Sequence, residues 1–370
     1  MNRLLKFLFH ILLLTATAGC AGSGAVPAAP PAQETTTPAE KTPLVVFAAG
    51  SLIRPFDDLE KAFEAQNPQI DVLGEYHGSI QVIRHAAELH EPIDVVASAD
   101  HALIPMLMYT TTDSQSGKAN ASWYLRFATN RMGLAYTGKS RRAAEITPQN
   151  WCEVLSDPEV RFGLADPRFD AAGYRALMIL QLAQSVCGRP DLFDRMLAGA
   201  FQSPVLAVDE EGAAVVRVPE ILETRKDSRV VLRGGSIQLL ALLESGDVDY
   251  AFEYESVIRQ HNLELIQLPP ELNLGDPAFA ESYGKVKVKL DFQRFASVKP
   301  EFKGEQIGYG ITIPVTSPQP AAAAQYIAFL LGPEGRAVMA AAAHPLLEPV
   351  TADGYANLPE ALKPLCEPAP

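Results

Sequence analysis

Short apolar runs alternate with amphipathic segments from about residue 44 onward. The runs at 44–47, 70–73 and 93–96 have the length of buried β-strands. Between them, apolar residues recur every three or four positions, which is typical of helices with one buried face. This alternation predicts an α/β fold with a largely parallel sheet, in which ligands bind where strands end and helices begin.

The two helices expected in this first half differ in how their boundaries are marked. The first begins at Pro55 and ends before Pro68, because proline fits the first turn of a helix but interrupts its interior. The second follows Ser79. The apolar faces comprise Phe56, Leu59, Ala62 and Phe63 in the first helix and Ile80, Ile83, Ala87 and Leu89 in the second.

The second half of the chain repeats this plan. Segments 127–136 and 309–315 are expected to cross between two lobes, and a late helix at 321–331 would return to the first lobe. Two lobes joined by two crossings predict a hinged cleft that closes around a ligand. The expected elements of the second lobe are strands at 162–165, 230–232 and 250–254, and helices at 174–186 and 237–243, the latter ended by Gly246.

Four helical segments open on a step of small residues. A helix N-terminus presents unpaired N–H groups and the positive end of the helix dipole, and glycine lets a ligand approach the backbone. Several such ends converging would bind a small anion without Arg or Lys. Ordinary helix capping is the alternative, since Ser and Gly are common at these positions. The four steps are Gly50-Ser51, Gly78-Ser79, Ala172-Gly173 and Gly235-Ser236.

The first residues have the pattern of an export signal. Arg3 and Lys6 precede an apolar run too short for an ordinary membrane-spanning helix. The small residues before Cys20 resemble a bacterial lipobox, which predicts a signal peptide at 1–19 and a lipid on Cys20. Secretion with an unmodified Cys20 is the alternative. Residues 20–42, rich in Ala, Pro and Thr, are expected to form a flexible linker.

Composition and charge restrict the class of partner. The 370 residues are 48% hydrophobic and 20% charged, enough for about two domains with a sizeable core. The net charge of −13 argues against a nucleic-acid binder. Export permits disulfides, and Cys152 with Cys187 is the favoured pair, leaving Cys366 free. An odd number of cysteines after Cys20 leaves other pairings open.

Several segments, taken in order, resemble the molybdate/tungstate-binding proteins of ABC importers, most closely the branch first known from archaea. The resemblance spans about residues 44–350. It implies a type II periplasmic-binding-protein fold, in which two α/β lobes joined by two crossover strands hold an oxyanion in the cleft. The segments that carry it are 46–52 (VFAAGSL), 97–100 (ASAD), 123–124 (WY), 127–130 (FATN), 173–175 (GYR), 249–254 (DYAFEY), 260–263 (QHNL) and 309–314 (YGITIP).

The resemblance also implies a set of ligand-binding residues. Ser51 and Ser79 match the serines of the first lobe, and Ala172 and Ser236 match donating positions of the second. Tyr254 matches a tyrosine whose hydroxyl reaches the anion. No further cofactor is expected, because the oxyanion itself is the ligand.

One departure concerns the carboxylates that expand the metal coordination in the archaeal branch. Asp170 matches the first of them, whereas Ser236 stands where that branch has a glutamate. A free carboxylate about 4 Å from a dianion is repelled by roughly 8 kcal/mol at an effective dielectric constant of about 20. Asp170 either coordinates Mo or W directly, or turns away or stays protonated beside a tetrahedral anion. A donor at Ser236 favours the tetrahedral anion.

The sequence therefore predicts a lipid-anchored, monomeric receptor that is not an enzyme and delivers molybdate or tungstate to a membrane permease. Its lobes are expected at 43–128 with 306–365, and at 129–305. Asp100 and Arg175 are expected to be structural. The alternatives are another oxyanion such as sulfate or phosphate, a scaffold lipoprotein, and a hydrolase that uses Ser79 and His77.

Overall fold

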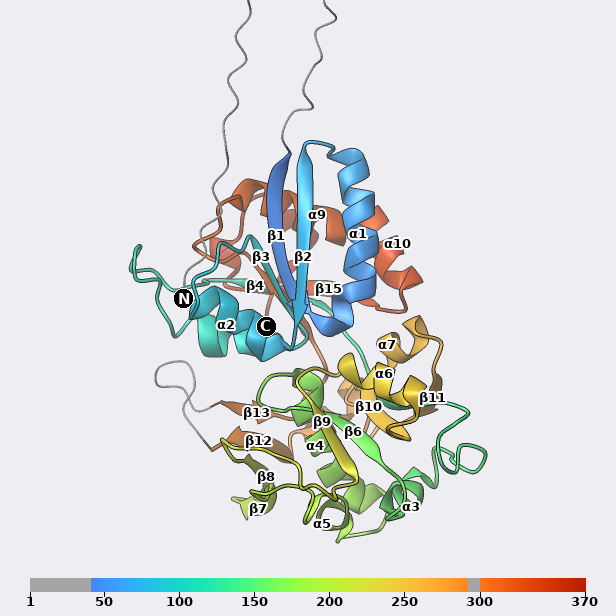
Figure 1. The fold of residues 1–370 in the computed structure, drawn as a ribbon. Helices are drawn as coiled ribbons and strands as arrows, with labels where there is room; N and C mark the ends of the chain where they lie inside the picture. The colour runs from blue at the N-terminus through green and yellow to red at the C-terminus, as the bar shows by residue number, and fades with distance from the viewer. Residues whose placement is uncertain (1–40, 292–299) are drawn as a thin grey trace, which may run out of the picture. The chain divides into compact units, whose positions relative to one another are not determined.

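The first apolar run forms a strand next to one edge of the largest sheet. The computed structural model describes residues 41–291 and 300–370, which belong to one compact unit (Figure 1). In this sheet β1 pairs in parallel with both β2 and β3, as the alternating pattern predicts. The strand order is β16 (Glu367–Pro368), β15 (Leu346–Asp353), β4 (Tyr124–Ala128), β14 (Tyr309–Thr312), β3 (Val95–Ser98), β1 (Thr42–Ala49) and β2 (Ile70–His77).

The second sheet contains five strands from the middle of the chain. Strand β6 pairs in parallel with β9 and β10, while β5 runs antiparallel to β10 and β11. The carboxyl ends of β6, β9 and β10 therefore meet at one edge of this sheet. The strand order is β11 (Glu264–Gln267), β5 (Met132–Tyr136), β10 (Tyr250–Tyr254), β6 (Phe162–Ala165) and β9 (Val230–Arg233).

A four-stranded sheet was not anticipated from the sequence. Its order is β13 (Glu301–Lys303), β12 (Val286–Leu290), β8 (Ala213–Val218) and β7 (Leu206–Glu210). It packs on helix α4 (Ala171–Val186), where the ring of Phe302 stacks on Tyr174 with centroids 4.0 Å apart. This contact fixes the start of α4, which carries candidate site residues.

The expected helices are present, with one boundary corrected. Helices α1 (Ile53–Gln66), α2 (Ser79–Ala87), α6 (Gln238–Ser245) and α9 (Pro320–Leu331) lie where the pattern predicts. Helix α6 ends at Gly246, which adopts the left-handed conformation that glycine tolerates best. Leu89 was assigned to the buried face of α2, but the helix ends at Ala87 and Leu89 is 55% exposed.

The remaining helices are α3 (Trp151–Ser156), α5 (Leu192–Leu197), α7 (Glu255–Gln260), α8 (Ala280–Tyr283) and α10 (Pro333–Ala341). Buried side chains from the helices and sheets form a continuous apolar core. None of the helices within residues 41–291 and 300–370 is both long and apolar enough to cross a membrane.

Only one of the two expected crossing segments crosses between the sheets. Segment 127–136 leaves the seven-stranded sheet at the end of β4 and enters the five-stranded sheet at β5. Segment 309–315 was also expected to cross, and that is wrong. Strand β14 pairs with β3 and β4 inside the seven-stranded sheet, so the chain has already entered this sheet by Tyr309. The exact bounds of the two lobes stay a prediction.

The favoured disulfide is present. Cys152 at the start of α3 is bonded to Cys187 at the end of α4, and Cys366 is a free thiol. The signal peptide, the lipid on Cys20 and the linker up to residue 40 fall outside the described residues. The linker was expected to end at residue 42, but Thr42 already belongs to β1.

Candidate functional site

The strand ends of the two larger sheets face one another. Steps Gly50-Ser51 and Gly78-Ser79 follow β1 and β2, and the loop ending at Asp170 follows β6. The amide of Ile80 in α2 donates to the carbonyl of Phe169 at 3.1 Å. A Cβ atom on Gly78 would lie 2.4 Å from that carbonyl oxygen, so only glycine permits this approach. The predicted anion-binding ends are therefore brought into contact.

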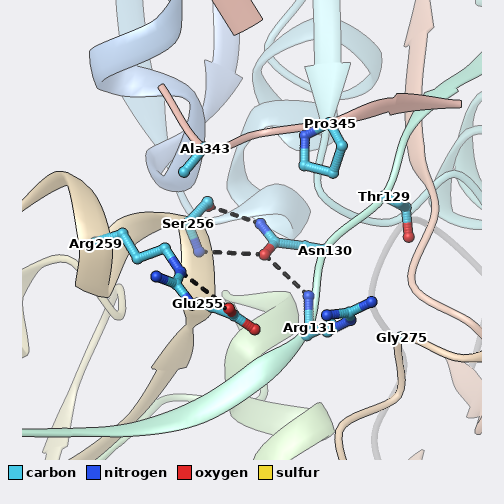
Figure 2. Close-up of a pocket in the computed structure, with 9 residues that line it drawn as sticks. All are labelled: Thr129, Asn130, Arg131, Glu255, Ser256, Arg259, Gly275, Ala343 and Pro345. Atoms are coloured by element: carbon cyan, nitrogen blue, oxygen red, sulfur yellow. Dashed lines mark hydrogen bonds and ion pairs between the residues drawn. The ribbon is translucent and has the colours of Figure 1, made fainter. Parts of the chain in front are cut away.

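Ser51 lies in a short turn of 3₁₀-helix before α1, and its hydroxyl is 2.8 Å from the hydroxyl of Tyr309. The Asn130 side-chain amide donates to Tyr309 at 3.2 Å and to Ser256 at 2.8 Å. Asn130 and Ser256 line a cavity of about 200 Å³ at the crossing segment; Figure 2 shows the residues around it. A polar chain thus runs from the crossing segment to Ser51.

Ser79 begins α2 and is 1% exposed. Its hydroxyl oxygen accepts a hydrogen bond from the amide of Ala99, after β3, at 3.0 Å. A hydroxyl that accepts one bond still has its own proton to donate, so Ser79 is fixed in place and remains a donor.

The Asp170 side chain accepts hydrogen bonds from amide groups that were expected to bind the anion. One carboxylate oxygen accepts from the amide of Ala172 at 2.8 Å, and the other accepts from the amide of Ser236 at 3.0 Å. The first bond caps α4. Burial raises the pKa of Asp170 above its usual value, although the two amides act in the opposite direction. An incoming anion must compete with this carboxyl group.

The Tyr254 hydroxyl belongs to a buried ionic cluster that lies between the two larger sheets. Arg175 on α4 donates to the Tyr254 hydroxyl at 2.6 Å and to the Ala99 carbonyl at 2.8 Å. It also lies 3.7 Å from the carboxylate of Asp100, which accepts from Tyr174 at 2.5 Å. Asp100 and Arg175, expected to be structural, therefore adjoin a candidate ligand residue. Burial raises the pKa of Tyr254 well above its usual value, so its phenol stays protonated.

Glu253 was missed by sequence reasoning. It precedes Tyr254 on β10, is fully buried, and accepts from the Ser236 hydroxyl at 3.1 Å and from the Tyr254 amide at 2.7 Å. Its only sequence signal is an acidic residue inside an apolar strand pattern, which is uncommon because burying a charge is costly.

Ser79 and His77, the residues that the hydrolase alternative would use, have different partners. His77 lies 3.5 Å from Glu75 and its ring stacks on His85, whereas Ser79 is bonded to Ala99. Within the described part of the chain, no group of three or more His, Cys, Asp and Glu side chains is placed to hold a metal ion.

Comparisons with known proteins show the family of the chain. Residues 44–342 match the family described as bacterial extracellular solute-binding protein. An uncharacterized solute-binding protein of Methanoculleus marisnigri is 36% identical over 330 residues, covering 89% of this chain and 88% of that protein. The molybdate/tungstate-binding protein WtpA of Thermococcus kodakarensis is 35% identical over 365 residues, covering 96% and 94%.

A solved structure supports the fold assignment. The periplasmic molybdate-binding protein of Azotobacter vinelandii superposes with a TM-score of 0.52 at 15% identity, covering 82% of this chain and 99% of that one. The likeness confirms the predicted type II periplasmic-binding-protein fold. The relatives are solute-binding proteins, which confirms the expectation of binding rather than catalysis and agrees with export. The chain belongs to the bacterial extracellular solute-binding protein family.

Proposed function

We propose that this protein captures molybdate or tungstate between the strand ends of its two larger sheets and delivers it to an ABC permease. The observation that carries the proposal is the convergence of Ser51, Ser79, Asp170, Ser236 and Tyr254 around the contact between those strand ends. The name of the Thermococcus relative, 35% identical over nearly the whole chain, supports this class of ligand.

The proposed donors are hydroxyl and backbone N–H groups. Ser51 and Ser79 contribute hydroxyls, Ala172 and Ser236 contribute amides, and Tyr254 contributes its phenol. Arg175 donates to the Tyr254 oxygen, which leaves the phenolic proton available to the anion. The cation acts through Tyr254 while Asp100 balances its charge. Binding in this way depends on positioned dipoles from both sheets, so neither half would bind well alone.

Asp170 governs the coordination in this proposal. Its carboxyl group accepts hydrogen bonds from the amides of Ala172 and Ser236, which are the donors proposed for the oxyanion. We propose that the dianion takes over these amides while remaining tetrahedral, with Asp170 protonated or turned aside. Protonation is favoured because burial raises the pKa of this carboxyl group. Direct coordination of Mo or W by Asp170 is the competing arrangement.

The proposed receptor is a membrane-anchored monomer. A lipid on Cys20 would tether a monomeric receptor to the membrane, and the segment before residue 43 would let it reach the permease. Sulfate or phosphate is the second candidate cargo, because a site built of donors binds any tetraoxo anion that fits.

Calorimetric titration with molybdate, tungstate, sulfate and phosphate tests the cargo. We expect molybdate and tungstate to bind more tightly than the other two, because the larger anions reach donors on both sides. Ser51→Ala and Ser79→Ala should each weaken binding about tenfold, the usual effect of one lost hydrogen bond to a charged group. Ser245→Ala, at an exposed position in α6, is the control and should change nothing. Tighter binding of sulfate or phosphate would overturn the assignment.

A further inference from the structure

The two oxygens of the buried Glu253 carboxyl group have different surroundings. Oε1 accepts two hydrogen bonds, from the hydroxyl of Ser236 and the amide of Tyr254. Oε2 is buried and has no hydrogen-bond partner in the structure. Both donors to Oε1 belong to proposed ligand residues, so the carboxyl group is held at the candidate site. A buried polar atom without a partner is costly, and it calls for a ligand or a neutral state.

This asymmetry matches a neutral carboxylic acid, whose carbonyl oxygen accepts while its hydroxyl needs an acceptor. We propose that Glu253 is a further ligand-binding residue, which donates a hydrogen bond from Oε2 to an oxygen of the bound tetraoxo dianion. The inference rests on the proposed function, since the dianion is the acceptor. It adds an acidic donor to a set otherwise made of hydroxyls and amides.

The local charge balance supports a neutral Glu253. Asp100, Asp170 and Glu253, if all ionised, carry three negative charges against the single positive charge of Arg175. A dianion entering this cluster would meet a net charge of −2 and strong repulsion, because burial weakens screening. A proton on Glu253 removes one of these charges and turns the side chain into a donor.

The burial of Glu253 favours that proton. Burial is the main cause that raises its pKa to about 8, and the negative charge of Asp170 acts in the same direction, while the bonds from the Tyr254 amide and the Ser236 hydroxyl act in the opposite one. On strand β5, Gly133 lies at the register position opposite Glu253 and carries no charge. The first residue of α6 is Gln238, and Glu255 at the start of α7 is paired with Arg259.

The titratable groups on the remaining described elements do not pair with Glu253. Arg175 on α4 is engaged with Tyr254, Ala99 and Asp100, and Tyr309 on β14 is a phenol whose pKa burial raises. No cation is therefore bonded to the Glu253 carboxyl group among the described residues.

Ser236 positions the Glu253 carboxyl group in this arrangement. The resemblance places a glutamate there in the archaeal branch, and this chain instead has a hydroxyl that donates to Glu253. The carboxyl group near the anion is thus supplied by β10 and held in position by Ser236. A carboxylate at position 236 would instead add a charge beside Asp170 and Glu253.

Paired substitutions test the inference by calorimetric titration with molybdate. Glu253→Gln keeps a donor without a titrating proton and should bind within about threefold of the unchanged protein at pH 7. Glu253→Ala removes the donor and should lose about 10- to 100-fold in affinity. Asp249→Asn, at the opposite end of β10 and also buried, controls for loss of a buried acid. It should leave the affinity unchanged.

The pH profile and the proton balance give a readout that a structural role would not move. Affinity of the unchanged protein should fall as the pH rises through about 8, whereas that of Glu253→Gln should fall less steeply. Titrations at pH 8 in two buffers of different ionisation heat should reveal proton uptake on binding that is smaller in Glu253→Gln. Equal affinities, equal pH profiles and equal proton uptake in all variants would overturn the role of Glu253. No binding by the unchanged protein would instead overturn the proposed function.

Discussion

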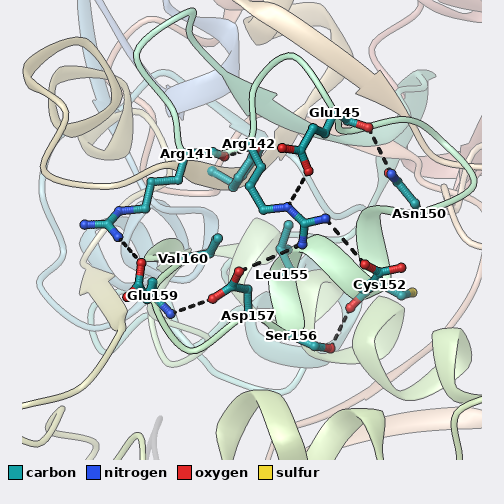
Figure 3. Close-up of polar contacts among 12 residues, drawn as sticks. Arg141, Arg142, Glu145, Asn150, Cys152, Leu155, Ser156, Asp157, Glu159 and Val160 are labelled. Carbon is teal, nitrogen blue, oxygen red and sulfur yellow. Dashed lines mark hydrogen bonds and ion pairs between the residues drawn. The ribbon is translucent and has the colours of Figure 1, made fainter.

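Two arginine clusters in this protein differ in burial, and the contrast shows which ion pairs contribute to the stability of the fold. Arg175 is 5% exposed and contacts Asp100, Ala99 and Tyr254 between the two larger sheets. Arg142 lies near α3, where it reaches Glu145 and Asp157 (Figure 3). It is also 3.4 Å from the carboxylate of Glu153. Arg142 has more carboxylate partners, yet its partners are largely exposed to water.

The difference follows from solvation. A charge pair in water gains little because water and salt screen it and both side chains lose freedom. A buried pair is different: removing one partner leaves the other charge or dipole without solvent. Near α3 the disulfide of Cys152, rather than the ion pairs, is expected to supply most of the stabilisation. Between the sheets, the ionic cluster also sets the orientation of candidate ligand residues.

The largest effect is expected from Arg175→Ala. It leaves Asp100 buried without its cation and Tyr254 without a donor, so the free energy of unfolding should fall by about 3–5 kcal/mol. Urea denaturation measures the change, and molybdate affinity should fall in the same variant. An unchanged denaturation midpoint would mean that the buried cluster does not stabilise the fold.

Reduction of the Cys152–Cys187 disulfide is expected to have the next largest effect. The bond closes a loop with a sequence separation of 35, for which chain entropy gives about 3–4 kcal/mol. Denaturation with and without reductant measures it. Cys366→Ser is the control, since it removes the free thiol and should respond to reductant as the unchanged protein does. Insensitivity to reductant would contradict the bond.

Raising the pH from 7 towards 8 should lower stability through Glu253. The folded protein holds this proton up to a pKa of about 8, whereas the unfolded chain releases it near 4.5. The unfolded state therefore binds fewer protons between these values, and stability falls as the pH rises until it levels above about 8. Denaturation midpoints should show this slope, and Glu253→Gln should reduce it.

His344 does not disturb that measurement. Burial lowers its pKa to about 3, so the folded protein keeps the ring neutral. Its effect appears only as the pH falls below about 6.5, where the unfolded chain gains a proton and stability is lost. A slope between pH 7 and 8 that survives intact in Glu253→Gln would assign it to another group.

Asp170→Asn separates the two coordination models. The amide removes the negative charge and keeps one acceptor oxygen, so only one of the Ala172 and Ser236 N–H groups retains its bond and the other is free for the anion. If the anion is tetrahedral, affinity for molybdate at pH 8 should rise by about tenfold, because charge repulsion is relieved. A loss of affinity would instead indicate that Asp170 binds Mo or W directly.

The smallest effect is expected from Arg142→Gln. Its three partners retain contact with water when the cation is removed, so the denaturation midpoint should not move measurably. The same urea experiment serves as the surface counterpart of Arg175→Ala. A loss as large as that of Arg175→Ala would remove the distinction between the two clusters.

The local pattern predicted elements well where one face of a segment is apolar. Strand β1 and helices α1, α4 and α6 appear where the periodicity placed them. It failed at Leu89, because a single apolar residue after the last helical turn does not show whether the helix continues. It also failed at 309–315, since a buried run can belong to a sheet or to a crossing segment.

The sequence by itself determined the alternation of strands and helices in the two larger sheets, the small residues that begin the helices, and the family. These depend on periodicity and on local backbone chemistry, which neighbouring residues encode. Only the tertiary structure decided that Asp170 also takes the amide of Ser236, and that Arg175 reaches Tyr254. Such bonds join residues separated by up to 79 positions, and burial, which no local pattern records, decides their strength.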